Sequence, residues 1–193
     1  SEARAFGPEP LVHGMDCADF DMDGDLDVLL TAVGKTLLLA NRGDGTFEDI
    51  TAKVGLDINF GDPKAVCFFD YDNDGDLDVY VVVAGGENRL FRSSGNANNW
   101  IRISLQGTEG NRDGIGARLE LVSGNLTQFR EVPAGRGHIH DPIEQVFGLG
   151  SREKVDKLRI TWPGGETQEV GPLPINARVF VVQGGSWSTL SSE

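Results

Sequence analysis

The sequence of 193 residues has few cysteines, few basic side chains and no long apolar run. Its two cysteines, Cys17 and Cys67, allow at most one internal disulfide bridge, and two buried free thiols are the alternative. Lys and Arg number 17 against 30 Asp and Glu, so nothing resembles the basic footprint of a nucleic-acid-binding protein. Because no apolar stretch approaches the length that spans a bilayer, we also expect no membrane insertion.

The acidic residues are concentrated in the first half of the chain. Residues 1–95 carry 19 Asp and Glu and 7 Lys and Arg, whereas residues 96–193 carry 11 and 10. Two segments dominate, DFDMDGDLD at residues 19–27 and DYDNDGDLD at residues 70–78, and they begin 51 residues apart. Like charges at alternate positions repel one another, so the pattern predicts a cation that lies among the carboxylates.

The spacing D-x-D-x-D-G-x-x-D in both segments predicts two Ca²⁺ sites. Calcium takes about 6 to 8 oxygen ligands, which positions 1, 3, 5 and 9 can supply as carboxylates and position 7 as a backbone carbonyl. Gly24 and Gly75 permit the sharp turn that wraps the chain around the ion. The predicted ligands are Asp19, Asp21, Asp23, Asp25 and Asp27 in the first loop, and Asp70, Asp72, Asp74, Asp76 and Asp78 in the second.

An EF-hand begins with the same D-x-D-x-D-G pattern, but it needs a bidentate Glu at position 12 of the loop. That position is Leu30 in the first segment and Val81 in the second, and neither side chain can bind a metal. Both residues lie in strand-like runs rather than in an exiting helix. Mg²⁺ fits less well than Ca²⁺ because it prefers few carboxylates and retained waters.

Hydrophobic patterning predicts an all-β chain in two parts. Each Asp-rich segment precedes an apolar, β-branched run, VLLTAV at residues 28–33 and VYVVVAG at residues 79–85, and a repeat of this length with several short strands is typical of propeller blades. From Trp100 onward apolar and polar residues alternate, with Ile101, Ile103 and Leu105 on one face and Trp100, Arg102 and Ser104 on the other, which indicates an antiparallel β-sandwich. We expect a region of two propeller-type blades over residues 1–95, a sandwich over residues 96–185 and a tail over residues 186–193.

These motifs resemble two known families. The Asp-rich loops, their following strands and ANRGDGTFEDIT at residues 40–51 resemble FG-GAP/VCBS repeats of calcium-binding β-propellers. The motifs NNWIRISLQG (98–107), NRDGIGARL (111–119), FGLG (147–150) and ITWPGG (160–165) resemble the ASPIC/UnbV domain of cartilage-acidic-protein-like chains. The resemblance implies a secreted or cell-surface protein that is loaded with calcium and has a structural or adhesive role.

No sign of catalysis accompanies this resemblance. The sequence has no nucleophile elbow, H-E-x-x-H motif, P-loop or dinucleotide-binding fingerprint, and its dense carboxylate groups are assigned to metal. The chain begins at Ser1 without a signal-peptide pattern, so we interpret it as a mature or excised piece. We therefore predict a protein that is not an enzyme; the alternative is a carbohydrate-binding or carbohydrate-processing module, for which Trp187 is the most obvious exposed aromatic residue.

The number of blades predicts a partner. A propeller needs about four blades to close, whereas this chain has two Asp-rich loops. The chain is then a fragment of a longer protein, or the sandwich covers the open blade face, or copies cover one another. We favour self-association as a homo-oligomer or filament, in which residues 1–11 pair with a neighbouring chain or represent the last strand of an absent blade.

Three weaker signals remain. His138, His140 and Asp141 could meet around a transition metal, although ordinary loop residues are the favoured interpretation. Asn125 begins the only N-x-[ST] glycosylation motif, at the tip of an expected hairpin. Arg112 and Asp113 could bind a ligand, although a turn-stabilising Asp and a solvated Arg are favoured.

Overall fold

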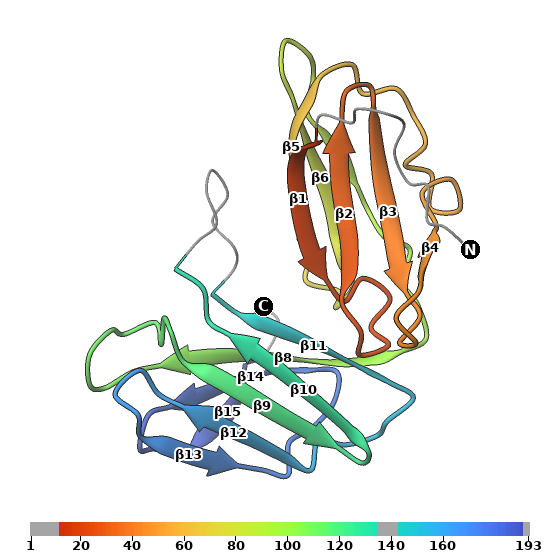
Figure 1. The fold of residues 1–193 in the computed structure, drawn as a ribbon. Helices are drawn as coiled ribbons and strands as arrows, with labels where there is room; N and C mark the ends of the chain where they lie inside the picture. The colour runs from red at the N-terminus through yellow and green to blue at the C-terminus, as the bar shows by residue number, and fades with distance from the viewer. Residues whose placement is uncertain (1–11, 135–142, 191–193) are drawn as a thin grey trace. The chain divides into compact units, whose positions relative to one another are not determined.

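The computed structural model describes residues 12–134 and 143–190, which form fifteen β-strands and no helix. The contacts between residues divide the chain into two compact units (Figure 1). The first unit consists of residues 1–21 and 25–96, and the second of residues 22–24 and 97–193. The predicted all-β class with propeller-type blades and a sandwich is confirmed. No helix among the described residues is long and apolar enough to cross a membrane.

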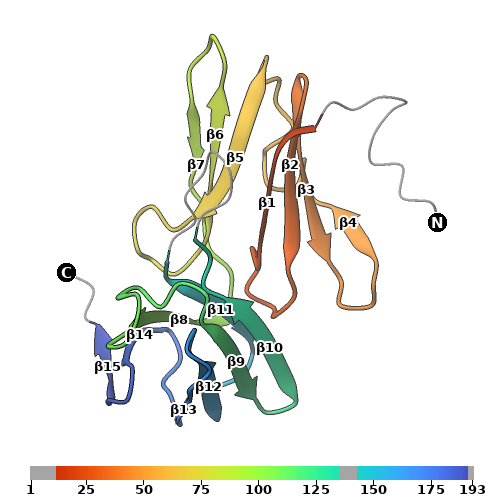
Figure 2. The ribbon, with the colours of Figure 1, turned by 60° about the vertical axis from the view of Figure 1, so that its left-hand side comes forward.

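The first unit contains two antiparallel sheets, each built around one Asp-rich loop (Figure 2). The strands of the first sheet, in spatial order, are β1 (Val12–Ala18), β2 (Asp27–Ala32), β3 (Lys35–Asn41) and β4 (Phe47–Asp49). Those of the second sheet are β5 (Pro63–Phe69), β6 (Asp78–Val83) and β7 (Arg89–Phe91). The Asp-rich loops connect β1 to β2 and β5 to β6, so each loop ends where the next strand begins.

The two sheets of the first unit pack together through apolar side chains and through a close approach of the backbone at one glycine. Leu29, Leu38, Val66 and Val81 are completely buried, and burying each such side chain stabilises the fold by about 1.5 to 3 kcal/mol. Strand β1 lies against β5, where the backbone amide of Phe68 donates a hydrogen bond to Asp16 Oδ2 at 2.8 Å. A Cβ added at Gly14 would lie 2.9 Å from the Cα of Ala65, so only glycine allows this approach.

The second unit is a sandwich of two four-stranded sheets. One sheet has the order β10 (Leu126–Glu131), β9 (Arg118–Ser123), β12 (Lys157–Thr161) and β13 (Thr167–Val170). The other has the order β11 (Gln145–Gly150), β8 (Asn99–Gln106), β14 (Ala177–Val182) and β15 (Trp187–Leu190). Ile101, Ile103 and Leu105 point into the common core, which confirms the predicted apolar face of this segment.

The sandwich differs from the prediction in the direction of one strand pair and in the extent of its last strand. Strand β14 pairs with β8 in parallel, so the sandwich is not wholly antiparallel; about seventy residues separate the two strands, which is ample for the crossover that parallel pairing needs. Residues 187–190, expected within a tail, form β15 and pair with β14. Trp187 packs against the core at the start of this strand, so it is not the exposed aromatic residue that we expected for glycan binding.

A third difference concerns Arg102, which the alternation placed on the polar face of β8 but which is only 3% exposed. Its neighbour Glu144 lies 3.8 Å from the guanidinium and also accepts hydrogen bonds from Arg178 Nε (3.1 Å) and Ser104 Oγ (3.0 Å). Burial lowers the pKa of Arg102, an effect that the negative charge of Glu144 opposes. Face alternation alone does not show that a charged side chain lies in a buried polar network.

Candidate metal centres

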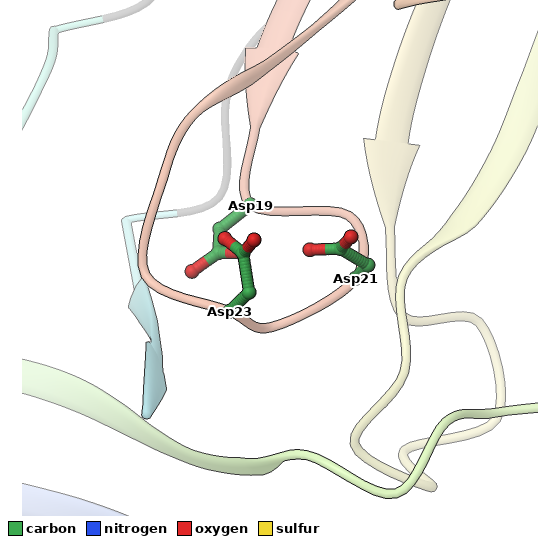
Figure 3. A group of neighbouring side chains, drawn as sticks. All are labelled: Asp19, Asp21 and Asp23. Atoms are coloured by element: carbon green, nitrogen blue, oxygen red, sulfur yellow. The ribbon is translucent and has the colours of Figure 1, made fainter. Parts of the chain in front are cut away.

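The first Asp-rich loop brings three carboxylates together. Asp19, Asp21 and Asp23 each place one oxygen so that the three atoms lie within 4.8 Å of one another. Figure 3 shows these side chains pointing toward one another inside the loop. Asp19 is only 2% exposed, so its charge is held away from bulk water. An all-oxygen set of carboxylates this close together suits a hard cation such as Ca²⁺.

Asp27, the ninth residue of the first motif, closes the loop from inside. Its Oδ2 accepts a hydrogen bond from the backbone amide of Phe20 at 2.7 Å, and its Oδ1 accepts one from Asn41 at 2.8 Å. The side chain is 1% exposed and ties the loop to the end of β3. Each carboxylate oxygen has a second lone pair, so these bonds leave the predicted role as a metal ligand open.

The second loop also brings three carboxylates together, at the first, third and ninth positions of its motif. Asp70, Asp72 and Asp78 place one oxygen each within 4.8 Å of the others. Asp78 is 1% exposed and accepts hydrogen bonds from the backbone amides of Tyr71 at 2.8 Å and Ser93 at 2.7 Å. These contacts correspond to those of Asp27 in the first loop.

The backbone of the two loops also agrees. Met22 and Asn73, at the same position of the motif, have φ of 59° and 60°. Gly24 and Gly75 have φ of 112° and 105°, which confirms the predicted need for glycine at this turn. Left-handed backbone is unusual for methionine, so the loop holds this residue in a strained conformation. The two loops, whose motifs differ at two positions, therefore adopt the same backbone turn.

The seventh residue of each motif has a role that the sequence analysis missed. A Cβ added at Gly43 would lie 2.6 Å from Asp25 Oδ2, and one added at Gly95 would lie 2.5 Å from Asp76 Oδ2. Each carboxylate thus packs against a glycine beyond the third strand of its sheet. Burial, followed by the negative charge of Asp74, raises the pKa of Asp76 above its usual range. The predicted use of these residues through their backbone carbonyls stays a prediction.

The two loops differ in the position of their fifth aspartate, which is Asp74 in the second loop. It is absent from the second group of converging oxygens, whereas Asp23 at the same motif position belongs to the first. Asp74 Oδ2 instead lies 3.3 Å from Arg92 Nη2, and Arg92 Nε contacts Asp72. Arg92 follows β7 and belongs to no recognised motif, so the sequence analysis did not find it.

The remaining candidates lie apart from these loops. Cys17 on β1 and Cys67 on β5 are half-buried and are not joined by a disulfide, so the possible bridge is not formed in this structure. Asn125 is exposed at the turn between β9 and β10, as a glycan would require, and its Oδ1 accepts a hydrogen bond from Arg152. His138, His140 and Asp141, and residues 1–11, lie outside the described residues. Arg112 and Asp113 are exposed in a turn.

Comparisons with known proteins agree with the order of these motifs. Residues 19–81 match the family described as FG-GAP-like repeat, and residues 107–187 match the family described as ASPIC and UnbV. The chain is 28% identical to cartilage acidic protein 1 of Mus musculus and 27% identical to that of Homo sapiens, in each case over 177 residues. Both alignments cover 82% of this chain but 26% of the relative, so the chain spans about a quarter of the length of these proteins.

A shorter alignment gives the same relative in another animal. Over 70 residues the chain is 35% identical to cartilage acidic protein 1 of Xenopus tropicalis, which covers 36% of this chain and 11% of the relative. The FG-GAP-like match includes both Asp-rich loops, and the ASPIC and UnbV match falls within the sandwich unit. The chain therefore combines a segment that matches FG-GAP-like repeats with a following segment that matches an ASPIC and UnbV domain.

Proposed function

We propose that this chain is a non-enzymatic, calcium-binding structural module of a secreted or cell-surface protein. One observation carries the calcium assignment: two loops that begin 51 residues apart share converging carboxylates, a buried ninth aspartate and the same left-handed backbone angles. In an acidic turn that binds no metal, nothing would favour this agreement, because the carboxylates would only repel one another. A divalent ion at each centre offsets the repulsion and stiffens the connection between two strands.

Calcium binding is tested by calorimetry and thermal unfolding. We expect two Ca²⁺ per chain, with dissociation constants in the range of about 10⁻⁴ to 10⁻³ M that is typical of extracellular modules. An ion that binds only the native state adds about 2.7 kcal/mol at a hundredfold excess over its Kd. Calcium should therefore raise the melting temperature and EDTA should lower it. Identical melting curves in calcium and EDTA would reject the assignment.

The adhesive part of the proposal rests on apolar surface in the first unit. Met15 and Val33 are 62% and 61% exposed, and the second sheet has three strands where the first has four. Such surface favours contact with further blades of a longer protein or with another copy of the chain. Light scattering in calcium, with and without residues 1–11, tests self-association. A monomer in both cases would reject self-association by this chain.

A glycan-binding role is the second candidate, because the structure exposes an aromatic residue that the sequence analysis overlooked. Phe129 on β10 is 67% exposed and lines a hollow of about 440 Å³ on the sheet that contains β9, β10 and β12. Arg118, Glu120 and Arg159 line the same hollow. A saccharide could stack on the ring and hydrogen-bond to the charged groups. A glycan array with the wild type and Phe129→Ala tests this, and binding that survives the substitution would exclude the hollow.

A further inference from the structure

We propose that Arg92 is a built-in counter-ion of the second loop that competes with Ca²⁺ for Asp72 and Asp74, so that the second site binds the ion more weakly than it would without the arginine. The inference rests on the proposed calcium function and adds to it a residue that lowers the affinity of one of the two sites. This residue lies outside both aspartate motifs.

The contacts of Arg92 place a positive charge on two predicted calcium ligands. Its Nη2 lies 3.3 Å from Asp74 Oδ2, and its Nε contacts Asp72 Oδ2. A guanidinium is not deprotonated in proteins, so Arg92 is charged at any pH at which the protein is folded. The guanidinium therefore acts on these oxygens as a stand-in cation.

The strand register identifies the equivalent position in the first sheet. Val28 on β2 pairs with Leu39 on β3, and Val79 on β6 pairs with Phe91 on β7. The residue after Leu39 is Ala40, so Ala40 corresponds to Arg92.

Two further contacts support this correspondence. The next residues, Asn41 and Ser93, donate their backbone amides to Asp27 and Asp78. Gly43 and Gly95, two residues further on, both adjoin the seventh aspartate of their loop. Three independent contacts thus align the two sheets in the same register.

The first loop consequently has no arginine at this position. The methyl group of Ala40 is buried and carries neither charge nor donor. In the first loop the fifth aspartate, Asp23, converges with Asp19 and Asp21, whereas in the second loop Asp74 is held by Arg92 and stays outside the converging group. The two groups also differ at the ninth aspartate, since Asp78 belongs to the second group whereas Asp27 does not belong to the first.

Competition follows from the charges. For Ca²⁺ to bind Asp72 and Asp74, the guanidinium must leave these oxygens or remain beside a divalent ion that repels it. Arg92 is 64% exposed, and exposed ion pairs are weak, so water can accommodate the displaced side chain. We therefore expect the arginine to lower the affinity of the second site by roughly three- to tenfold, rather than to abolish binding. The effect should shrink at high ionic strength, because salt screens exposed charges.

The test measures calcium binding at the second loop alone. In a background of Asp23→Ala, which removes a central ligand of the first loop, calorimetry compares the arginine with Arg92→Ala and with Arg89→Ala. Arg89 is an exposed residue of β7 and serves as the matched control for the loss of one positive charge. We expect a three- to tenfold tighter second site for Arg92→Ala and a change of less than about twofold for Arg89→Ala.

A spectroscopic probe adds a signal that belongs to the second loop. Tyr71 lies in the second motif where Phe20 stands in the first, so it can sensitise the luminescence of Tb³⁺, an oxygen-binding ion that substitutes for Ca²⁺. The part of the luminescence that is lost in Tyr71→Phe reports the second site. This part should appear at lower Tb³⁺ concentration in Arg92→Ala than in the wild type.

The outcomes separate the inference from the calcium proposal. Unchanged or weaker binding in Arg92→Ala would overturn the inference and show that the arginine orients the carboxylates instead. Equal tightening in Arg89→Ala would also overturn it, because the effect would then be one of net charge. If the wild-type chain binds no calcium at all, the proposed function itself fails. Circular dichroism on each variant checks that its substitutions leave the fold intact.

Discussion

Asp78 gives the sharpest test of how the Asp-rich loops are held. Its carboxylate accepts backbone hydrogen bonds from Tyr71 at 2.8 Å and from Ser93 at 2.7 Å, and its side chain is 1% exposed. The first bond closes the loop on itself, and the second fastens it to the segment after β7. Asp78→Ala removes both bonds, whereas Asp78→Asn keeps one acceptor oxygen and removes the charge.

The magnitude follows from these contacts. Hydrogen bonds to a charged group contribute about 1.5 to 3 kcal/mol each, so the two bonds set an upper limit of about 6 kcal/mol. Tyr71 is exposed and Ser93 is half-buried, so water can reach their amides after the substitution, and the repulsion from Asp70 and Asp72 is relieved. We therefore expect a loss of about 2 kcal/mol in the free energy of unfolding for Asp78→Ala and about half of that for Asp78→Asn.

Urea unfolding in excess EDTA measures this structural contribution without the metal. Asp57→Ala is the matched control, because Asp57 is exposed in the same unit, and a surface substitution of this kind changes stability by less than about 0.5 kcal/mol. Repeating the measurement in calcium should enlarge the loss for Asp78→Ala, since the variant also loses a ligand. A variant as stable as the control in EDTA would refute the view that this carboxylate fastens the loop.

Three further predictions test the loops and the exposed surface. Asp74→Ala should bind one fewer Ca²⁺ per chain in calorimetry, and an unchanged stoichiometry would mean that the second loop is not a site. Gly95→Ala should lower the free energy of unfolding by more than Gly34→Ala, measured in urea: both residues have positive φ, but only at Gly95 would the new Cβ meet a carboxylate, at 2.5 Å from Asp76. Val33→Asp should reduce the apparent mass in light scattering if exposed apolar surface drives self-association, and an unchanged mass would exclude this residue from the contact.

The sequence predicts the parts of this fold that depend on local pattern. Apolar runs of β-branched residues predict the strands after each Asp-rich segment, and alternation predicts the core positions Ile101 and Ile103. Gly24 and Gly75 are predicted at the turns because the motif demands backbone that other residues rarely adopt. Trp187 was misjudged because nothing in a short polar C-terminal stretch shows that β14 offers a free edge to pair with.

The contacts made by Arg92 could not be predicted from the repeat spacing. The two Asp-rich segments are offset by 51 residues, and the same offset would align Arg92 with Asn41. Counted along the strand register, the connection between β6 and β7 is one residue longer than the connection between β2 and β3. The structural equivalent of Arg92 in the first sheet is therefore Ala40. Only the pairing of the folded strands reveals this shift, and with it the position from which a side chain can reach Asp72 and Asp74.

The shift also bears on how such a module responds to calcium. The two motifs are identical at every aspartate, so the motifs alone give no reason for the two sites to differ in affinity. The equivalent positions beside the two loops are Ala40, on the third strand of the first sheet, and Arg92, just after the third strand of the second sheet. Ala40 places a buried methyl group there, whereas Arg92 places a guanidinium. Because the cation and the arginine need the same oxygens, we expect the affinity of the second site to depend on a position that no metal-binding motif includes. The aspartates therefore predict the number of sites, whereas the affinity of the second site also depends on the strand beside it.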